Sequence, residues 1–134
     1  MGVAALAAFF FLRGPGDEER RVAGTQLTPA ELSDAYSELC DVSAQAGSDV
    51  DAARDLFYGR VHSPLHEIAR VAGEVDRSVA ARLLEAKNDV ERAFADDAPA
   101  PEVSAALGRL LPRTGQALRS VGVTTSDCDP SPTP

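Results

Sequence analysis

Hydrophobic residues recur at intervals of three and four positions in four successive stretches of the chain. That spacing places them on one face of an α-helix, which turns once every 3.6 residues. No stretch alternates strictly between apolar and polar positions, so no β-sheet is expected. Helices of about twenty residues joined by short loops favour neighbours that run in opposite directions. The pattern therefore predicts an all-α fold, an antiparallel up-down four-helix bundle.

The first helix carries a clear start signal. Thr28 is suited to the N-cap, Pro29 to the first helical position, and Glu31 to the third, which completes a capping box. Gly47 is expected to end the helix. The apolar positions between these ends are Leu32, Ala35, Tyr36, Leu39 and Cys40.

The second helix contains a proline. Ser48 or Asp49 can cap its start, and Ser63 with Pro64 resembles the cap and first residue of a further helix, so two short helices are one alternative. However, the apolar spacing passes through Pro64 without a slip, so we expect one long helix that is kinked or briefly broken near Pro64. Its apolar positions are Val50, Ala53, Phe57, Val61, Leu65, Ile68, Ala72 and Val75.

Two more helices follow. Asp76 is the expected cap of the third, residues 96–101 form a connector, and Pro101 with Glu102 begins the fourth, which ends at Gly122. The apolar face of the third helix consists of Val79, Leu83, Ala86, Val90 and Phe94. The apolar face of the fourth consists of Val103, Leu107, Leu110, Leu111, Ala117, Leu118 and Val121.

Composition agrees with closely packed helices and excludes one class of partner. Hydrophobic residues make up 44% of the 134 residues, aromatic residues only 5%, and tryptophan is absent, so Ala, Leu and Val must build the core. The formal net charge is -8, Lys87 is the only lysine, and the sequence has no basic stripe. Because binding to a phosphate backbone needs such a stripe, we expect no nucleic-acid partner.

The N-terminal segment suggests export or membrane attachment. Val3 to Leu12 is an unbroken apolar run that Arg13 follows. At about half the length needed to span a bilayer, the run is typical of a signal-peptide remnant or a clipped membrane anchor. We therefore assign residues 1–13 to such a segment. A buried N-terminal helix is the alternative, and a true start upstream would explain the missing basic residues before the run. Residues 14–27 are interpreted as a linker.

The two cysteines favour the same compartment. An even cysteine count in an exported helical protein predicts a disulfide, here between Cys40 and Cys128; the alternative is two unrelated thiols. Residues 28–122 then form the bundle, and residues 123–134 form a disordered tail that Cys128 pins to it. The chain has no CxxC motif, which argues against a redox dithiol or a zinc ribbon.

The only two histidines, His62 and His66, are four positions apart. On a continuous helix this spacing puts both imidazoles on one face, where together with Asp55 they could bind Zn, Cu or Ni. At about 100° per residue, this face points away from the apolar stripe. The alternative is an ordinary polar surface, and a new helix starting at Ser63 would remove the geometry.

Small residues share the outward face with the histidines. Gly59, Ala69 and Gly73 would let another helix approach closely, so this face is a candidate docking surface for a partner protein or a second copy. The alternative is that the glycines only mark helix ends.

Signals for catalysis are poor. Cys40 lies on an apolar helix face, and Ser63 beside His62 lacks the third member and the oxyanion donors of a triad. The sequence therefore predicts an exported or membrane-tethered accessory or interaction protein that is not an enzyme and needs no cofactor. Its membrane contact would be the N-terminal segment, and its partner another protein or a second copy. The alternative function is a small extracytoplasmic bundle that binds a divalent transition metal such as Zn or Cu through His62 and His66.

Overall fold

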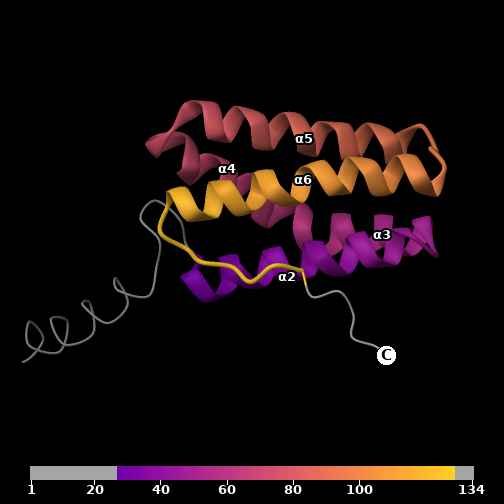
Figure 1. Cartoon of the computed structure of the whole chain (residues 1–134), viewed down its shortest axis with the longest axis horizontal. Helices are drawn as coiled ribbons and strands as arrows, with labels where there is room; N and C mark the ends of the chain where they lie inside the picture. Colours follow the sequence, from indigo (N-terminus) through magenta and orange to yellow (C-terminus); the bar gives the residue numbers. More distant parts are fainter. Residues whose placement is uncertain (1–26, 129–134) are drawn as a thin grey trace, which may run out of the picture.

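The computed structural model describes residues 27–128, and this part of the chain contains helices and no strand. The elements are α2 (Pro29–Ala46), α3 (Val50–Leu56), the π-helical turn η1 (Phe57–Val61), α4 (His62–Val75), α5 (Arg77–Ala95) and α6 (Ala100–Ser120). Because α3, η1 and α4 follow one another without a gap, they form a single helical pass. Figure 1 shows the four passes side by side along the long axis of the molecule. The prediction of an all-α helical bundle is confirmed.

Two of the predicted segments fall almost wholly outside this range. The anchor or signal remnant at residues 1–13 and most of the linker at 14–27 precede the described residues, and the end of the tail, 129–134, follows them. Within residues 27–128, no helix is long and apolar enough to cross a membrane.

The helix starts follow the capping signals in the sequence. Thr28 and Glu31 form the predicted capping box, with the Thr28 amide donating to the Glu31 carboxylate at 2.8 Å and the Glu31 amide donating to the Thr28 hydroxyl at 3.1 Å. Asp49 caps α3 and Asp76 caps α5 through their carboxylates. The last helix begins at Ala100, one residue earlier than predicted. Local hydrogen bonding thus sets the helix boundaries.

One apolar core fills the space between the passes. Its aromatic centre is the pair Phe57 and Phe94, whose ring centroids lie 5.6 Å apart. The largest fully buried aliphatic side chains around this pair are Leu32, Leu39, Leu65, Ile68, Leu83, Leu107, Leu110 and Leu118. The helix α5 packs on both α4 and α6, and α2 packs on α3 and α6. Ala, Leu and Val therefore supply most of the core, as the composition indicates.

The irregular part of the second pass is a π turn, and the helix continues through Pro64 without a break. The backbone amide of His62 donates to the carbonyl of Phe57, five residues earlier. Pro64 has no amide hydrogen, and in a regular helix its ring would crowd the carbonyl of Arg60. The π turn ends at Val61, three residues before the proline. The irregularity expected near Pro64 therefore takes the form of a π turn.

The buried residues of α4 test the apolar spacing predicted for the second helix. A π turn spreads one turn over more residues than an α turn does, so later positions are rotated relative to a continuous α-helical wheel. Val75, predicted to be buried, is 64% exposed. The buried residues of α4 are Leu65, Ile68, Ala69, Val71 and Ala72. The predicted positions Leu65, Ile68 and Ala72 are therefore buried as expected, and the prediction is wrong only at Val75, the last residue of α4.

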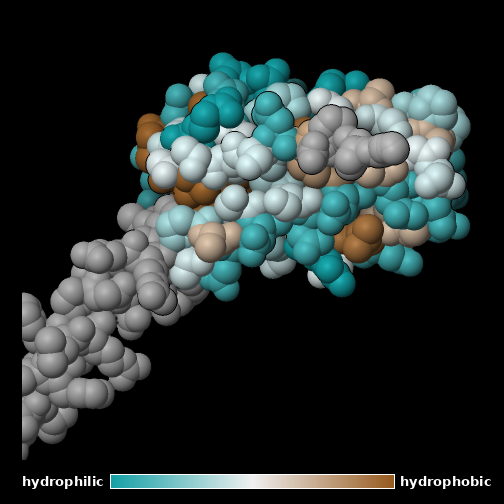
Figure 2. All heavy atoms as spheres, turned by 60° about the horizontal axis from the view of Figure 1, so that its bottom comes forward, coloured by the Kyte–Doolittle hydropathy of each residue, from teal (hydrophilic) through white to brown (hydrophobic). Residues whose placement is uncertain are grey.

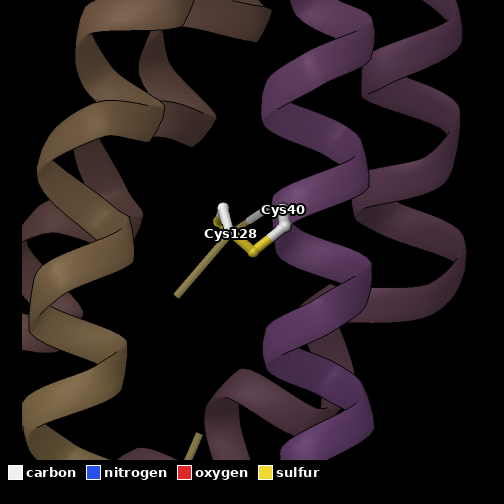
Figure 3. Close-up of a disulfide and its surroundings, with 2 residues drawn as sticks. All are labelled: Cys40 and Cys128. Carbon is white, nitrogen blue, oxygen red and sulfur yellow. A yellow bond between two sulfur atoms is a disulfide. The ribbon is translucent and has the colours of Figure 1, made fainter. Parts of the chain in front are cut away.

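The C-terminal segment returns along the bundle after α6. In Figure 1 it runs back beside α2, and Figure 3 shows the disulfide between Cys128 and Cys40 of α2. This bond confirms the predicted pairing and joins residues that are 88 positions apart, with their Cα atoms 5.4 Å from each other. Gly122 makes the reversal with a φ of 83°, a left-handed conformation that glycine adopts without strain. Val123 then enters the core and is 4% exposed.

Candidate functional site

The polar and aromatic side chains gather along the contact between α4 and α5. We call this group, which comprises Tyr58, His62, His66, Lys87 and Glu91, the histidine seam. Tyr58 comes from η1, the histidines from the start of α4, and Lys87 and Glu91 from the facing helix α5. His62, expected on a face that points away from the core, instead contacts α5 through Glu91.

Glu91 is the central acceptor of the histidine seam. One of its carboxylate oxygens, Oε2, lies 2.5 Å from Nζ of Lys87 and 2.8 Å from Nε2 of His62. The Lys87 side chain is only 3% exposed, whereas those of Glu91 and His62 are 25% and 33% exposed. Among the described residues, no buried side-chain nitrogen or oxygen lacks a hydrogen-bond partner. The only lysine of the chain is thus buried together with its counter-charge, as a buried ammonium requires.

The environment of Glu91 favours its charged form. Burial by itself would raise the pKa of this carboxyl, but the hydrogen bond and charge of Lys87, together with His62, outweigh it and lower the pKa. Glu91 is therefore a carboxylate at neutral pH and accepts hydrogen bonds from Lys87 and His62.

The two imidazoles lie against each other. The ring centroids of His62 and His66 are 4.8 Å apart, and the ring planes meet at 81°. Burial lowers the pKa of His66, and the charges of Lys87 and His62 lower it further, while Glu91 opposes them. His66 is exposed to solvent, so its neutral imidazole faces outward beside His62.

Tyr58 forms the aromatic end of the seam. Its ring lies 5.1 Å from that of Phe57, 5.3 Å from that of His62 and 6.1 Å from that of Phe94, yet the residue is 45% exposed. Burial of part of the ring raises the pKa of Tyr58; the nearby Glu91 raises it further, and Arg54 lowers it. The hydroxyl is therefore neutral at physiological pH and available as both donor and acceptor.

The structure does not assemble the predicted three-ligand metal site. His62 and His66 come together, but among residues 27–128 no group of three His, Cys, Asp or Glu side chains is placed to hold a metal ion. Asp55 is exposed on α3, before the π turn that rotates α4. The prediction that Asp55 joins the histidines assumed uninterrupted α-helical geometry, and the π turn removes that assumption.

The predicted small-residue docking face is also divided. Ala69 is only 4% exposed and belongs to the core, so its outward placement is wrong. A Cβ added to Gly73 would lie 3.3 Å from Cβ of Ala80 on α5, so this glycine allows α4 and α5 to approach closely. A Cβ on Gly59 would meet open space. Ala69 is therefore part of the core and Gly73 lies at the contact between α4 and α5, which leaves Gly59 as the exposed member of the three.

Lys87 and Glu91 are the site residues that the sequence reasoning did not connect with the histidines. Their spacing of four residues indicated only a pair on the helix surface. Lys87 follows Leu83 by four positions and Ala86 by one, which places it at the edge of the buried stripe. A single lysine at the edge of an apolar stripe indicates a buried ammonium group that is paired with a carboxylate.

A concavity lies between α5 and α6. It is an open hollow of about 540 Å³ near the connection of the two helices. Both acidic and basic side chains line it, among them Asp89, Arg92, Asp96, Glu102 and Arg109. Asp89 is paired with Arg92 at 3.0 Å. These mixed charges on an open surface give no convergent set of groups, so the histidine seam is the stronger candidate site.

Comparison with known proteins gives no relative. No protein-family model, no curated protein and no solved structure matches the chain. Fold and site together define a disulfide-pinned helical bundle with a histidine-bearing edge.

Proposed function

We propose that this protein is an exported or membrane-tethered accessory protein that acts by binding a partner protein and has no catalytic activity of its own. In this proposal, the partner contacts the exposed side of the histidine seam around Tyr58. The observation that supports it most is the state of Tyr58, which is 45% exposed although three rings surround it.

A tyrosine held in this way is well suited to recognition. Tyrosine is enriched at protein interfaces because it combines a large apolar ring with a polar hydroxyl. Since Phe57, His62 and Phe94 already restrict the ring, binding would cost little additional side-chain entropy. His66, which is exposed and packs against His62, adds a polar rim.

Two features support a location outside the cytoplasm. The Cys40–Cys128 disulfide is a type of bond that persists in oxidising compartments. The apolar run from Val3 to Leu12 supports an export signal or a membrane tether. The surface in Figure 2 is mostly polar, with scattered hydrophobic residues, as expected of a bundle that faces water.

Site-specific photo-crosslinking tests the partner. A photoreactive phenylalanine analogue replaces Tyr58 in the full chain, produced in its native cell. The same analogue at Ser37, which is exposed on α2, is the matched control. We expect a discrete adduct from position 58 and none from position 37. The mass of the adduct tells a different protein from a second copy of this chain.

Two results would contradict the proposal. One is that position 58 gives no adduct, and the other is that positions 58 and 37 give the same adducts. The compartment has its own test, which is non-reducing mass spectrometry of protein isolated from its native cell. We expect a chain lighter by two hydrogen atoms than the dithiol form, whereas free thiols at Cys40 and Cys128 would count against export.

A further inference from the structure

We propose that His62 and His66 together bind one divalent transition-metal ion, with Glu91 orienting His62 from behind. The protein supplies two ligands, and water fills the remaining positions on the ion. This inference goes beyond partner binding and does not depend on it.

The separation of the two rings fits a shared ion. With a metal–nitrogen bond of about 2.0–2.1 Å, each imidazole centroid lies about 3.2 Å from the metal, so two ligands at 90–109° have centroids about 4.5–5.2 Å apart. The observed separation of the His62 and His66 centroids is 4.8 Å. The centroid separation of His62 and His66 is therefore compatible with a shared ion.

Glu91 supplies the support that metal-binding histidines usually have. In such sites the ring nitrogen that does not bind the metal donates to a carboxylate, which fixes the tautomer and the orientation of the ring. Nε2 of His62 lies 2.8 Å from Oε2 of Glu91, so the lone pair of Nδ1 is left for the metal. Lys87 holds the same oxygen from the core side at 2.5 Å, which fixes the carboxylate in turn.

The charges around the pair determine which ions the site can take. The charges of Lys87 and Glu91 cancel, so these two residues contribute no net charge behind the ligands. The ion is therefore held by its nitrogen ligands. Imidazole ligands suit Cu²⁺, Ni²⁺ and Zn²⁺, with Cu²⁺ expected to bind most tightly. Hard ions such as Mg²⁺ and Ca²⁺ are not expected to bind.

Titration calorimetry with Cu²⁺ and with Zn²⁺ tests the site. The full chain is used without an affinity tag, and its N-terminal amine, which also binds Cu²⁺, is common to all variants. We expect His62→Ala and His66→Ala each to weaken binding at the site by at least tenfold, and Glu91→Gln to weaken it by about tenfold. The matched control is Asp55→Asn, which removes an exposed carboxylate of α3 and should bind as the wild type does.

Electron paramagnetic resonance of the Cu²⁺ form provides a second, independent readout. We expect hyperfine coupling to two imidazole nitrogens in the wild type and to one in either histidine variant. The proposal is overturned if folded His62→Ala and His66→Ala chains, checked by circular dichroism, bind Cu²⁺ and Zn²⁺ as tightly as the wild type. The proposal is also overturned if the wild type binds neither ion at a protein concentration of about 100 μM, which detects the weakest affinity of interest. Photo-crosslinking from position 58 with a metal chelator present reports separately on the partner.

Discussion

The two long edges of this bundle are held together in different ways. On one edge, α2 is joined to the C-terminal segment by the Cys40–Cys128 bond, and Val123 is buried beside it. On the other edge, α4 meets α5 through the histidine seam, where Lys87 and His62 share one oxygen of Glu91. A covalent bond and apolar packing hold the first edge. The polar and charged side chains described above lie at the second edge.

The two tyrosines show the same difference. Tyr36, on the pinned edge, is 8% exposed and packs beside Gly115 of α6, where an added Cβ would lie 3.6 Å from its Cε1 atom. Tyr58, in the histidine seam, is 45% exposed. One ring therefore fills the core while the other faces the solvent, so the same residue type serves packing at one edge and, in our proposal, recognition at the other.

The largest expected effect comes from breaking the pinned edge. Replacing Cys40 and Cys128 together by alanine should lower the free energy of unfolding by about 4–5 kcal/mol, because the bond closes a long loop in the unfolded chain. Urea unfolding without reductant measures this loss. A double variant as stable as the wild type would show that the edge is held by packing alone.

A smaller loss is expected from breaking the histidine seam. Glu91→Gln leaves the buried Lys87 ammonium without its counter-charge. We expect a loss of about 2–3 kcal/mol, below that of a fully buried pair because Glu91 is 25% exposed.

The matched control for this loss is the double variant Lys87→Met/Glu91→Leu, which removes both charges and keeps the side-chain volume. It should be more stable than Glu91→Gln alone. Urea unfolding of the single and double variants gives the comparison. If Glu91→Gln unfolds at the same urea concentration as the wild type, Lys87 does not depend on this carboxylate.

Two glycine variants separate internal packing from open surface. Gly59→Ala places its Cβ in open space within a helical pass and should stabilise the protein by about 0.5–1 kcal/mol. Gly73→Ala places its Cβ 3.3 Å from Ala80 and should cancel that gain or destabilise by up to about 1 kcal/mol. Thermal unfolding of both variants tests the order. Equal gains would mean that α4 and α5 are not closely packed at Gly73.

The smallest effect concerns alkaline pH. Burial is the main cause of the raised pKa values of Tyr36 and Tyr58. A raised folded-state pKa gives stability that is present below the ordinary value of 10 and lost as the pH rises above it. Melting temperatures of the wild type and Tyr36→Phe between pH 9 and 11 should therefore diverge above pH 10, with the variant losing less. Parallel curves would show that Tyr36 ionises as freely as in the unfolded chain.

The sequence by itself determined the features that depend on local bonding and periodicity. Thr28, Asp49 and Asp76 cap helices because each carboxylate or hydroxyl reaches an amide within three residues. The apolar spacing indicated the four helical passes. With only two cysteines in the chain, only one intramolecular disulfide was possible.

Only the tertiary structure decided what the second pass presents to its neighbours. Pro64 predicted an irregularity in this pass. Whether it took the form of a break or a π turn depended on how α3 and α4 together pack on the rest of the bundle. Ala69 is buried, Val75 is exposed, and no group of three potential metal ligands forms within residues 27–128. His62 contacts Glu91, 29 residues further along the chain, where α4 packs on α5. These placements depend on the sum of many contacts between residues far apart in the sequence, whereas a helix cap or an apolar stripe is determined within a few residues.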